Sequence, residues 1–197
     1  MPRVSRKQSE ANRDAICDAA ARLFRERGLQ GSSVAEVMSA AGLTHGGFYG
    51  HFDSKEALAA QACSRAFGQA KERWAKRHAP FRKRSRARLA TVDYHLSVSS
   101  RDAPGESCPV VGFAGDVARE PDDSPLRDAY TQGLKTLLAE FTALSDGRDV
   151  ASRRRQALAD FSMMIGALVL SRATRGDALS EELLDTARKT LHAQARS

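Results

Sequence analysis

The segment THGGFYGHFDSK, residues 44–55, concentrates hydrogen-bond donors of several kinds in a short stretch. Hydroxyl, imidazole, phenol and ammonium groups can all donate to phosphate oxygens, and a hydroxyl or an imidazole can also contact the edge of a base. Gly46 and Gly47 are adjacent in this segment, although glycine destabilises a helix by about 1 kcal/mol relative to alanine. A missing side chain lets a second surface approach the backbone closely. These residue types indicate contact with a nucleic acid.

Two short helices joined by a tight turn are predicted to position this segment. Ser33 and Glu36 have the spacing of a capping box, in which a hydroxyl and a carboxylate satisfy free backbone N–H groups at a helix start. Thr44 is available as the next N-cap, so a short third helix is predicted over residues 45–52. Apolar residues at helical spacing predict the first helix in residues 13–28. The arrangement is a helix-turn-helix.

The rest of the chain is predicted to be helical as well, because no stretch shows the alternation of a strand. Asp53 and Glu56 repeat the capping-box spacing and predict the start of a long fourth helix, which Pro80 ends. Further helices are expected at about 85–98, from Pro109 to Pro121, and at 125–144, 152–175 and 180–195, with a loop at 101–107. The expected fold is all-α with about nine helices, divided into residues 1–53 and residues 54–197.

The last two predicted helices carry a candidate interface. In residues 152–175, Leu158, Phe161, Ile165 and Leu168 recur three and four apart, and further apolar residues widen this surface, so that the helix needs two neighbours. Residues 180–195 are apolar on one side and charged on the other. Both helices would pair with their copies in a second chain as a four-helix interface. The alternative is that they complete the core of a monomer.

The net charge of +7 lies mainly toward the N-terminus. Residues 56–90 hold ten Lys and Arg against two Asp and Glu, whereas residues 91–197 hold 13 against 16. Such an asymmetry is expected when one part of a chain meets a polyanion, although a solvated basic face fits the charge pattern equally well.

Several other classes of protein are disfavoured. Cys17, Cys63 and Cys108 are far apart, and His45 and His51 would point to different faces of a helix, so we expect neither a metal site nor a cofactor. The sequence shows no secretory signal and no apolar run long enough for a membrane span, so a cytoplasmic protein without membrane contact is expected. Nucleophile elbows, phosphate loops and clustered carboxylates are missing from the sequence, so an enzyme is not expected.

Residues 15–58, AICDAAARLFRERGLQGSSVAEVMSAAGLTHGGFYGHFDSKEAL, resemble the DNA-binding domain of the tetracycline-repressor (TetR/AcrR) family of transcriptional regulators. The matching features are AA..LF...G in the first helix, the AAGLT turn and G.FY.HF.SKE.L. The resemblance implies a homodimer whose first three helices dock in the major groove of operator DNA. It also implies that the remaining helices form a ligand pocket and a dimer interface, and that a small molecule releases the operator.

The predicted DNA contacts follow from this resemblance and from the chemistry of the donors. The residues expected to contact DNA are Ser33, Thr44, His45, Gly47, Tyr49, His51 and Lys55. Thr44, His45 and Gly47 would face base edges and phosphates, and the free N–H groups at Ser33 would hold a phosphate. The resemblance implies phosphate contacts for Tyr49, His51 and Lys55; the alternatives are ring packing for the first two and simple solvation for the lysine.

Three neighbours of these residues receive other roles. Phe48 and Phe52 are assigned to the small core beneath the reading helix. Gly46 is expected to allow the turn to pack against the first helix. The basic tail PRVSRK, residues 2–7, is expected to reach the DNA backbone or a minor groove.

A ligand pocket is expected in the second half of the chain. The candidate lining residues are Trp74, Tyr94, Cys108, Phe113, Tyr130, Phe161, Met163 and Met164. The alternative for each is ordinary core packing, because apolar residues at helical spacing are mostly core. Cys108 precedes Pro109 at a predicted helix start, where unpaired N–H groups favour a thiolate.

The segment around Cys108, ESCPVVGFAGDVARE, resembles the cysteine-bearing segment of the N-ethylmaleimide-reductase repressor subgroup, whose members sense electrophiles through a cysteine there. This chain has Ser107 where that pattern has glycine, and a buried, unreactive cysteine is the alternative. The sequence therefore predicts a repressor that binds a palindromic operator as a homodimer and is released by a small-molecule or electrophile inducer. The competing hypotheses are a non-specific architectural DNA-binding protein and an enzyme without a recognisable motif.

Overall fold

The computed structural model describes residues 5–195, and no strand occurs in that range, so the predicted all-α class is confirmed. The elements in chain order are α1 Arg6–Arg27, α2 Val34–Ala40, the 3-10 helix η1 His45–Gly50, α3 Lys55–His78, α4 Arg84–His95, α5 Val98–Asp102, α6 Pro109–Val117, α7 Pro125–Leu144, α8 Val150–Ala173 and α9 Ala178–Gln194. Residues 2–4 of the predicted basic tail lie outside the described part of the chain. None of the described helices is both long and apolar enough to cross a membrane.

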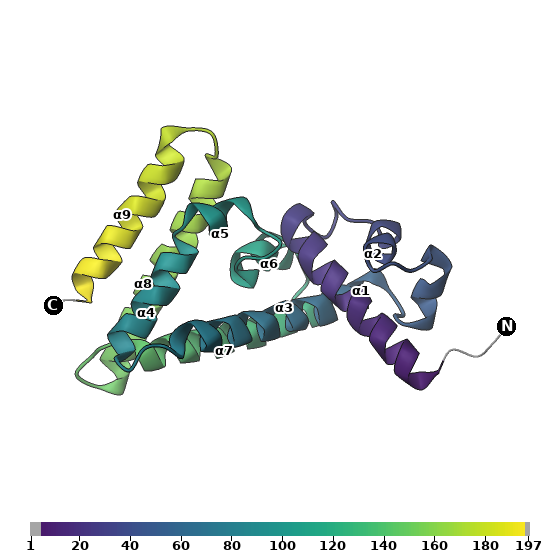
Figure 1. The fold of residues 1–197 in the computed structure, drawn as a ribbon, viewed down its shortest axis with the longest axis horizontal. Helices are drawn as coiled ribbons and strands as arrows, with labels where there is room; N and C mark the ends of the chain where they lie inside the picture. Colours follow the sequence, from purple (N-terminus) through teal and green to yellow (C-terminus); the bar gives the residue numbers. More distant parts are fainter. Residues whose placement is uncertain (1–4, 196–197) are drawn as a thin grey trace.

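The helices α1 and α2 and the 3-10 helix η1 form a unit at one end of the molecule (Figure 1). The capping box at the start of α2 is present, with the Ser33 side chain accepting from the Glu36 N–H and the Glu36 carboxylate accepting from the Ser33 N–H. The reading element η1 is a tight 3-10 helix rather than the predicted α-helix over residues 45–52. Thr44 occupies its N-cap position, but the Thr44 side chain makes no capping hydrogen bond.

The predicted capping box at the start of α3 is wrong by one residue. The helix begins at Lys55, so Ser54 and not Asp53 is the N-cap, and the Ser54 hydroxyl accepts from the Ala57 N–H at 3.1 Å. Glu56 is consequently the second residue of the helix rather than the third. Hydrogen bonds from the Glu56 N–H and the Ser54 side chain lower the pKa of its carboxyl.

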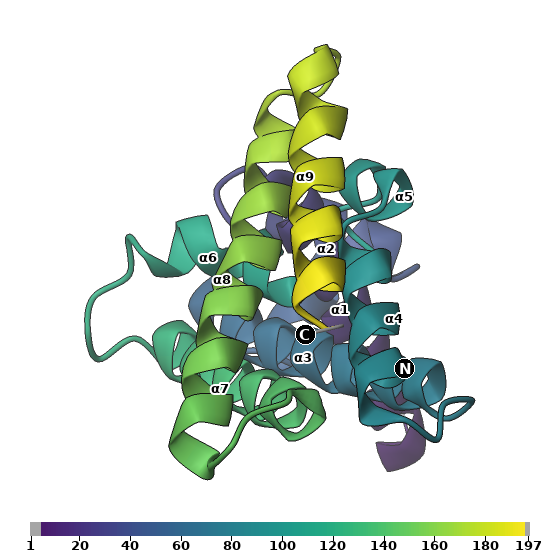
Figure 2. The same ribbon diagram turned by 90° about the vertical axis from the view of Figure 1, so that its left-hand side faces the viewer.

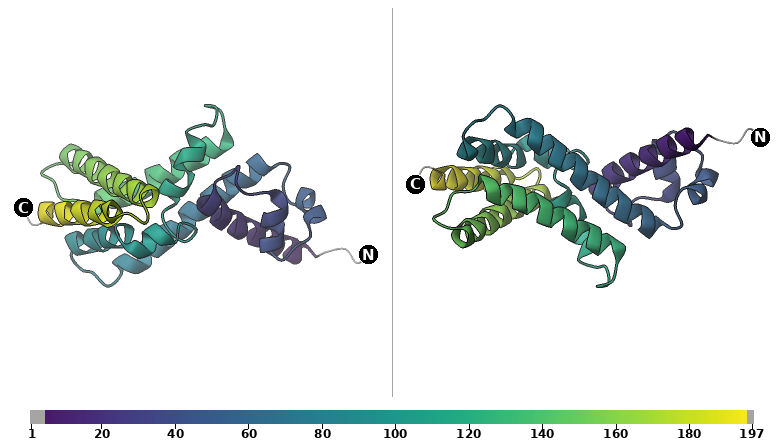
Figure 3. Two further views of the ribbon diagram at one scale, coloured as in Figure 1. Left: turned by 90° about the horizontal axis from the view of Figure 1, so that it is seen from above. Right: turned by 90° about the horizontal axis from the view of Figure 1, so that it is seen from below.

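The long helix α3 joins the N-terminal unit to the rest of the fold. It packs against α1 on one side and runs along α7 on the other (Figure 3). The Arg65 guanidinium donates to both carboxylate oxygens of Asp18, at 2.8 and 2.9 Å, and to Asp14 at 3.0 Å, which fastens α3 to α1. One hydrophobic core extends through both parts of the chain. The proposed division near residue 53 therefore lies at the start of a helix that both parts share.

The middle of the chain differs from the prediction. Helix α4 ends at His95, and the short helix α5 follows where the predicted helix and loop met. Ser97 causes this break, because its hydroxyl accepts from the Ser100 N–H at 3.1 Å and donates to the Tyr94 carbonyl at 2.7 Å. Helix α6 begins at Pro109 as predicted but ends at Val117, before Pro121.

Helices α8 and α9 lie side by side at the end of the molecule far from η1 (Figures 1 and 2). The predicted apolar stripe of α8 divides between two faces. Phe161 and Leu168 are buried in the core, whereas Leu158 is 42% exposed. We define the outer face of α8 by its positions between Leu158 and Leu170 that are not buried. This face consists of Leu158, Ala159, Ser162, Met163, Ile165, Gly166, Val169 and Leu170, and it carries no charged side chain.

His95, the last residue of α4, places a buried imidazole against α3 in the core. His95 is 1% exposed, its Nδ1 lies 2.8 Å from the Thr91 carbonyl oxygen, and its ring meets Trp74 edge-on at 5.6 Å. Burial lowers the pKa of His95 to about 4, and the nearby Arg77, Arg172 and Arg73 lower it further, against the Thr91 hydrogen bond. The ring is therefore neutral in the folded chain at pH 7.

This histidine predicts a loss of stability in mild acid. Because the unfolded chain binds a proton near pH 6.5 and the folded ring resists one until about pH 4, stability falls as the pH drops through this window. Because of His95, we expect the free energy of unfolding to be about 2 kcal/mol lower at pH 5 than at pH 8. Urea unfolding of His95→Gln should show a correspondingly flatter pH dependence. His45→Gln, which changes an exposed ring, should keep the wild-type dependence; an unchanged profile in His95→Gln would contradict the assignment.

Candidate nucleic-acid interface

The 3-10 helix η1 presents its polar residues outward over an aromatic base. Thr44 and His45 are exposed, and Tyr49 is 74% exposed. Phe48 is fully buried beneath them and stacks on the buried Phe52 with ring centroids 5.8 Å apart, as predicted. A 3-10 helix this short is held by such packing rather than by its own hydrogen bonds. The aromatic pair therefore fixes the surface on which the reading residues stand.

The adjacent glycines are not needed for packing within the chain, and the packing role expected for Gly46 is wrong. A Cβ at Gly46 would meet nothing within 4 Å, and a Cβ at Gly47 would meet only Met38 Cε at 3.7 Å, an ordinary contact. Neither glycine has a positive φ, since the positive values in the described part of the chain belong to Gly28, Gly42 and Gly176. The fold thus gives no reason for glycine at either position.

At the start of α2, where a phosphate contact was predicted, the Glu36 carboxylate accepts a hydrogen bond from the Ser33 N–H. Glu36 accepts from the Ser33 N–H at 2.8 Å and from the Ser33 hydroxyl at 2.8 Å, and these bonds, the backbone one foremost, lower the pKa of the Glu36 carboxyl. Arg27 also pairs with Glu36 at 3.0 Å. The same capping box that indicates the helix in the sequence therefore places a negative charge where a phosphate was expected. The phosphate contact of Ser33 stays a prediction.

Two cationic side chains fasten the segments that flank η1. The Lys55 ammonium donates to the Leu29 carbonyl oxygen at 2.6 Å, which leaves two of its three hydrogens for other partners. Arg13 on α1 donates to the His51 carbonyl oxygen at 2.6 Å, and its guanidinium lies 4.6 Å from the centre of the Phe52 ring. Arg13 was not predicted from the sequence, because a contact across 38 positions leaves no local pattern.

The predicted DNA-contacting residues come from three consecutive elements. Ser33 precedes α2, residues 44–51 form η1 and its flanks, and Lys55 begins α3; these elements lie together at the end of the molecule opposite α8 and α9 (Figure 1). Tyr49 is solvent-exposed rather than packed on the next helix, whereas His51 is half-buried. The exposed ring favours the contact role over the packing alternative for Tyr49.

The predicted pocket residues of the second half lie mostly in the core. Trp74, Phe113 and Met164 are at most 2% exposed, and Phe161 is 5% exposed. Trp74 and Phe161 belong to an aromatic cluster with Phe141, in which the rings of Phe141 and Phe161 are 5.7 Å apart and edge-on. Met163 lies on the outer face of α8. Ligand contact by these residues stays a prediction.

The two tyrosines among the pocket candidates are half-buried and hydrogen-bonded. Tyr130 donates to the Val110 carbonyl oxygen at 3.1 Å, and burial raises the pKa of its hydroxyl. Tyr94 donates to the Glu106 carbonyl oxygen at 3.3 Å, and the Arg77 guanidinium lies 3.7 Å from its ring centre. Both hydroxyls thus hold the segment around α6 in place.

Cys108 is the N-cap residue of α6, as its place before Pro109 predicts. The thiol is only 3% exposed, and burial raises its pKa although the Val111 and Val110 N–H groups point to it and lower it. Desolvation of the thiolate thus outweighs the helix terminus, which agrees with the alternative of a buried, unreactive cysteine. The folded chain holds Cys108 as a neutral, buried thiol.

Comparisons with known proteins agree with this architecture. Residues 16–62 match the family described as bacterial regulatory proteins, tetR family. The transcriptional repressor KstR2 of Rhodococcus jostii is 48% identical over 46 residues, which make up 23% of this chain and 22% of KstR2. The chain thus matches only about a fifth of the length of this curated relative.

The likeness in fold extends over nearly the whole chain. A TetR transcriptional regulator from Chloroflexus aurantiacus is 26% identical with a TM-score of 0.74, covering 97% of each chain. The reduced form of Escherichia coli NemR has a TM-score of 0.76 at 20% identity, covering 92% of this chain and 95% of NemR. Residues 16–62 thus match the DNA-binding domain of TetR-family regulators, and the fold of the chain is that of TetR-family transcriptional regulators.

Proposed function

We propose that the chain is a homodimeric repressor that binds a palindromic operator in the cytoplasm and releases it when a small molecule binds. The observation that carries this proposal is the uncharged outer face of α8, at the far end of the molecule from η1. A helix that exposes Leu158, Val169 and Leu170 to water needs a partner. A second copy satisfies this need with the same surface, as in a two-fold dimer.

Two-fold symmetry predicts the form of the DNA site. Two copies of η1 related by the dimer axis would contact two half-sites in successive major grooves, so the operator should be an inverted repeat. Within each half-site, Thr44 and His45 are the candidates for base contacts, and Tyr49, His51 and Lys55 are the candidates for phosphate contacts. With so few base-reading side chains, we expect most of the affinity to come from phosphates.

The buried state of Cys108 favours reversible ligand binding over electrophile chemistry as the release signal. A neutral thiol that is 3% exposed reacts slowly with electrophiles, because the thiolate is the nucleophile. A non-covalent inducer needs only a cavity that differs between the DNA-bound and the released states.

The DNA-binding proposal predicts both sequence selectivity and a steep salt dependence. Selection of duplexes from a random pool by the purified chain should enrich an inverted repeat. Binding to that duplex, measured by fluorescence anisotropy, should weaken by about 10³-fold between 50 and 200 mM salt, as expected for about six neutralised phosphates. Equal competition by random DNA would instead identify a non-specific architectural protein, and an affinity that is flat with salt would contradict the phosphate-based mode.

A further inference from the structure

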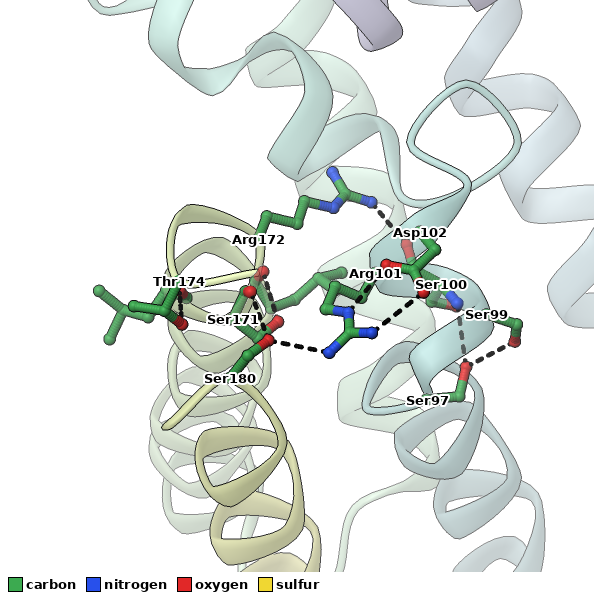
Figure 4. Close-up of polar contacts among 11 residues, drawn as sticks. Ser97, Ser99, Ser100, Arg101, Asp102, Ser171, Arg172, Thr174 and Ser180 are labelled. Atoms are coloured by element: carbon green, nitrogen blue, oxygen red, sulfur yellow. Dashed lines mark hydrogen bonds and ion pairs between the residues drawn. The ribbon is translucent and has the colours of Figure 1, made fainter. Parts of the chain in front are cut away.

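A cleft of about 450 Å³ lies where the N-terminal unit meets the rest of the chain. Its walls come from the end of α1, the segment after α5, the helix α6 and the end of α8. Four arginines line it, namely Arg25, Arg101, Arg172 and Arg175, against the single carboxylate of Glu26. Figure 4 shows Arg172 of α8 extending to α5, and Arg101 of α5 extending to Ser180 at the start of α9. None of the predicted pocket residues lines this cleft.

The charges of these arginines are unequally compensated. Arg101 is neutralised by Asp102, to which it donates at 2.8 and 3.0 Å, and it also donates to the Ser180 hydroxyl at 2.9 Å. Arg25, Arg172 and Arg175, in contrast, lie within 4 Å of no carboxylate among residues 5–195. The cleft therefore holds three arginines that form no ion pair with a carboxylate in the described part of the chain, and its four arginines outnumber its one lining carboxylate, that of Glu26.

Two of the unpaired guanidiniums are removed from water. Arg25 is 6% exposed and donates only to neutral carbonyls, those of Ala21 at 2.7 Å and Ser107 at 3.0 Å. Arg172 donates from Nη2 to the Ser100 carbonyl at 2.8 Å, while its Nε is buried without a hydrogen-bond partner. Burial lowers the pKa of Arg25 to about 10, so it stays charged at pH 7. Buried charges without a partner are costly, and a bound anion would remove this cost.

The remaining wall of the cleft is apolar. Val111 and Ala114 on α6 and Val169 at the edge of the outer face of α8 line it, and Gly115 leaves the backbone of α6 open. We propose that the cleft binds a small organic anion whose carboxylate or phosphate head lies between Arg172, Arg175 and Arg25 and whose apolar part lies on α6. The planar fork of arginine matches both kinds of head.

The cleft also lies on the contacts that orient the N-terminal unit. The Leu29 N–H, just after α1, donates to Asp116 of α6 at 2.9 Å, and Arg25 reaches from α1 to the Ser107 carbonyl. A Cβ at Gly112 would lie 2.5 Å from Arg25 Cγ, so α1 and α6 touch at the cleft. An anion that draws Arg25 and Arg172 together would shift α1 against α6. If the chain binds an operator as proposed, we infer that anion binding in this cleft changes its affinity for the operator.

Binding is tested first without DNA, with three probes that share one ring. Titration calorimetry on the purified dimer should give saturable binding of phenyl phosphate or benzoate and none of benzamide, which lacks the charge. The anion that binds more tightly shows whether the site prefers a phosphate or a carboxylate group. Arg172→Met should weaken binding by about tenfold or more, and Arg175→Met, which changes an exposed side chain, should weaken it less. The matched control Arg155→Met, an exposed arginine elsewhere on α8, should bind as wild type.

Several outcomes would overturn the site: no saturable anion binding, equal binding of benzamide, or wild-type binding by both Arg172→Met and Arg175→Met. The regulatory part is tested on the duplex selected by the wild-type chain. Saturating anion should change operator affinity by about tenfold in wild type and Arg155→Met, and not in Arg172→Met. Unchanged affinity in wild type would overturn the regulatory part. Failure to bind any duplex would reject the proposed function and leave the calorimetric result as it stands.

Discussion

Replacing Gly166 with glutamate is expected to convert the proposed dimer into a folded monomer. Gly166 lies in the middle of the outer face of α8, and a Cβ there would meet nothing within 4 Å in the single chain. The backbone is helical, so a longer residue is tolerated by the monomer. In a two-fold dimer, two carboxylates would be buried close to each other against Leu158 and Ile165, without a partner. Light scattering coupled to size exclusion should show the loss of the dimer at micromolar concentration.

The chain offers a closely matched control for this substitution. Gly68 is another glycine inside a long helix, on α3; it is exposed, and a Cβ there would likewise meet nothing within 4 Å. Gly68→Glu should therefore have the same effect on the stability of the single chain as Gly166→Glu, because it adds the same charge and replaces the same residue type, while leaving the dimer intact. A monomeric wild type, or a dimeric Gly166→Glu with normal circular dichroism, would show that the outer face of α8 is not the interface.

Operator binding should be lost together with the dimer. A monomer holds one half-site, so it loses the second set of phosphate and base contacts and the gain from linking them. We expect Gly166→Glu to weaken binding to an inverted repeat by about 100-fold or more, and Gly68→Glu to leave it unchanged. The dissociation of the dimer and the weaker operator binding would then have the same cause, a change on a surface that is distant from η1.

Local sequence signals predicted the elements they act on directly. The bounds of α7 agree with the predicted 125–144, because Pro125 suits a first helical position and the apolar spacing persists to the end. The Ser33 and Glu36 capping box and the buried pair Phe48 and Phe52 were predicted for similar reasons. Each of these signals lies within one or two turns of the residues that it controls.

What the sequence could not predict depends on contacts between distant segments. Lys55 bonds the Leu29 carbonyl across 26 positions, and Arg25 bonds the Ser107 carbonyl across 82. Phe161 is buried against Trp74 of α3 and Phe141 of α7 while Leu158 is exposed, and apolar spacing alone does not fix where these helices lie. The sequence left two alternatives for the Cys108 thiol for the same reason, since burial is a property of the assembled fold and the helix terminus is a local one.

The glycines of the reading element should show opposite effects on stability and on binding. In Gly47→Ala the new methyl group would meet only Met38 Cε at 3.7 Å, and alanine favours helix over glycine, so the melting temperature should stay the same or rise. If the backbone at Gly47 lies against the duplex, the same methyl group displaces the DNA. We expect operator affinity to fall by about 30-fold, equivalent to about 2 kcal/mol.

The same reasoning separates Gly46 from Gly47. Because no neighbour in the chain requires glycine at position 46, Gly46→Ala should also keep or raise the melting temperature, and its effect on operator affinity reports whether this position faces the duplex. Gly68→Ala, remote from η1, should gain stability without any change in DNA binding. Loss of the melting transition in Gly47→Ala would show that the glycine serves the fold. Full operator affinity in both Gly46→Ala and Gly47→Ala would show that the backbone at these two glycines does not touch DNA and that the pair of glycines has another origin.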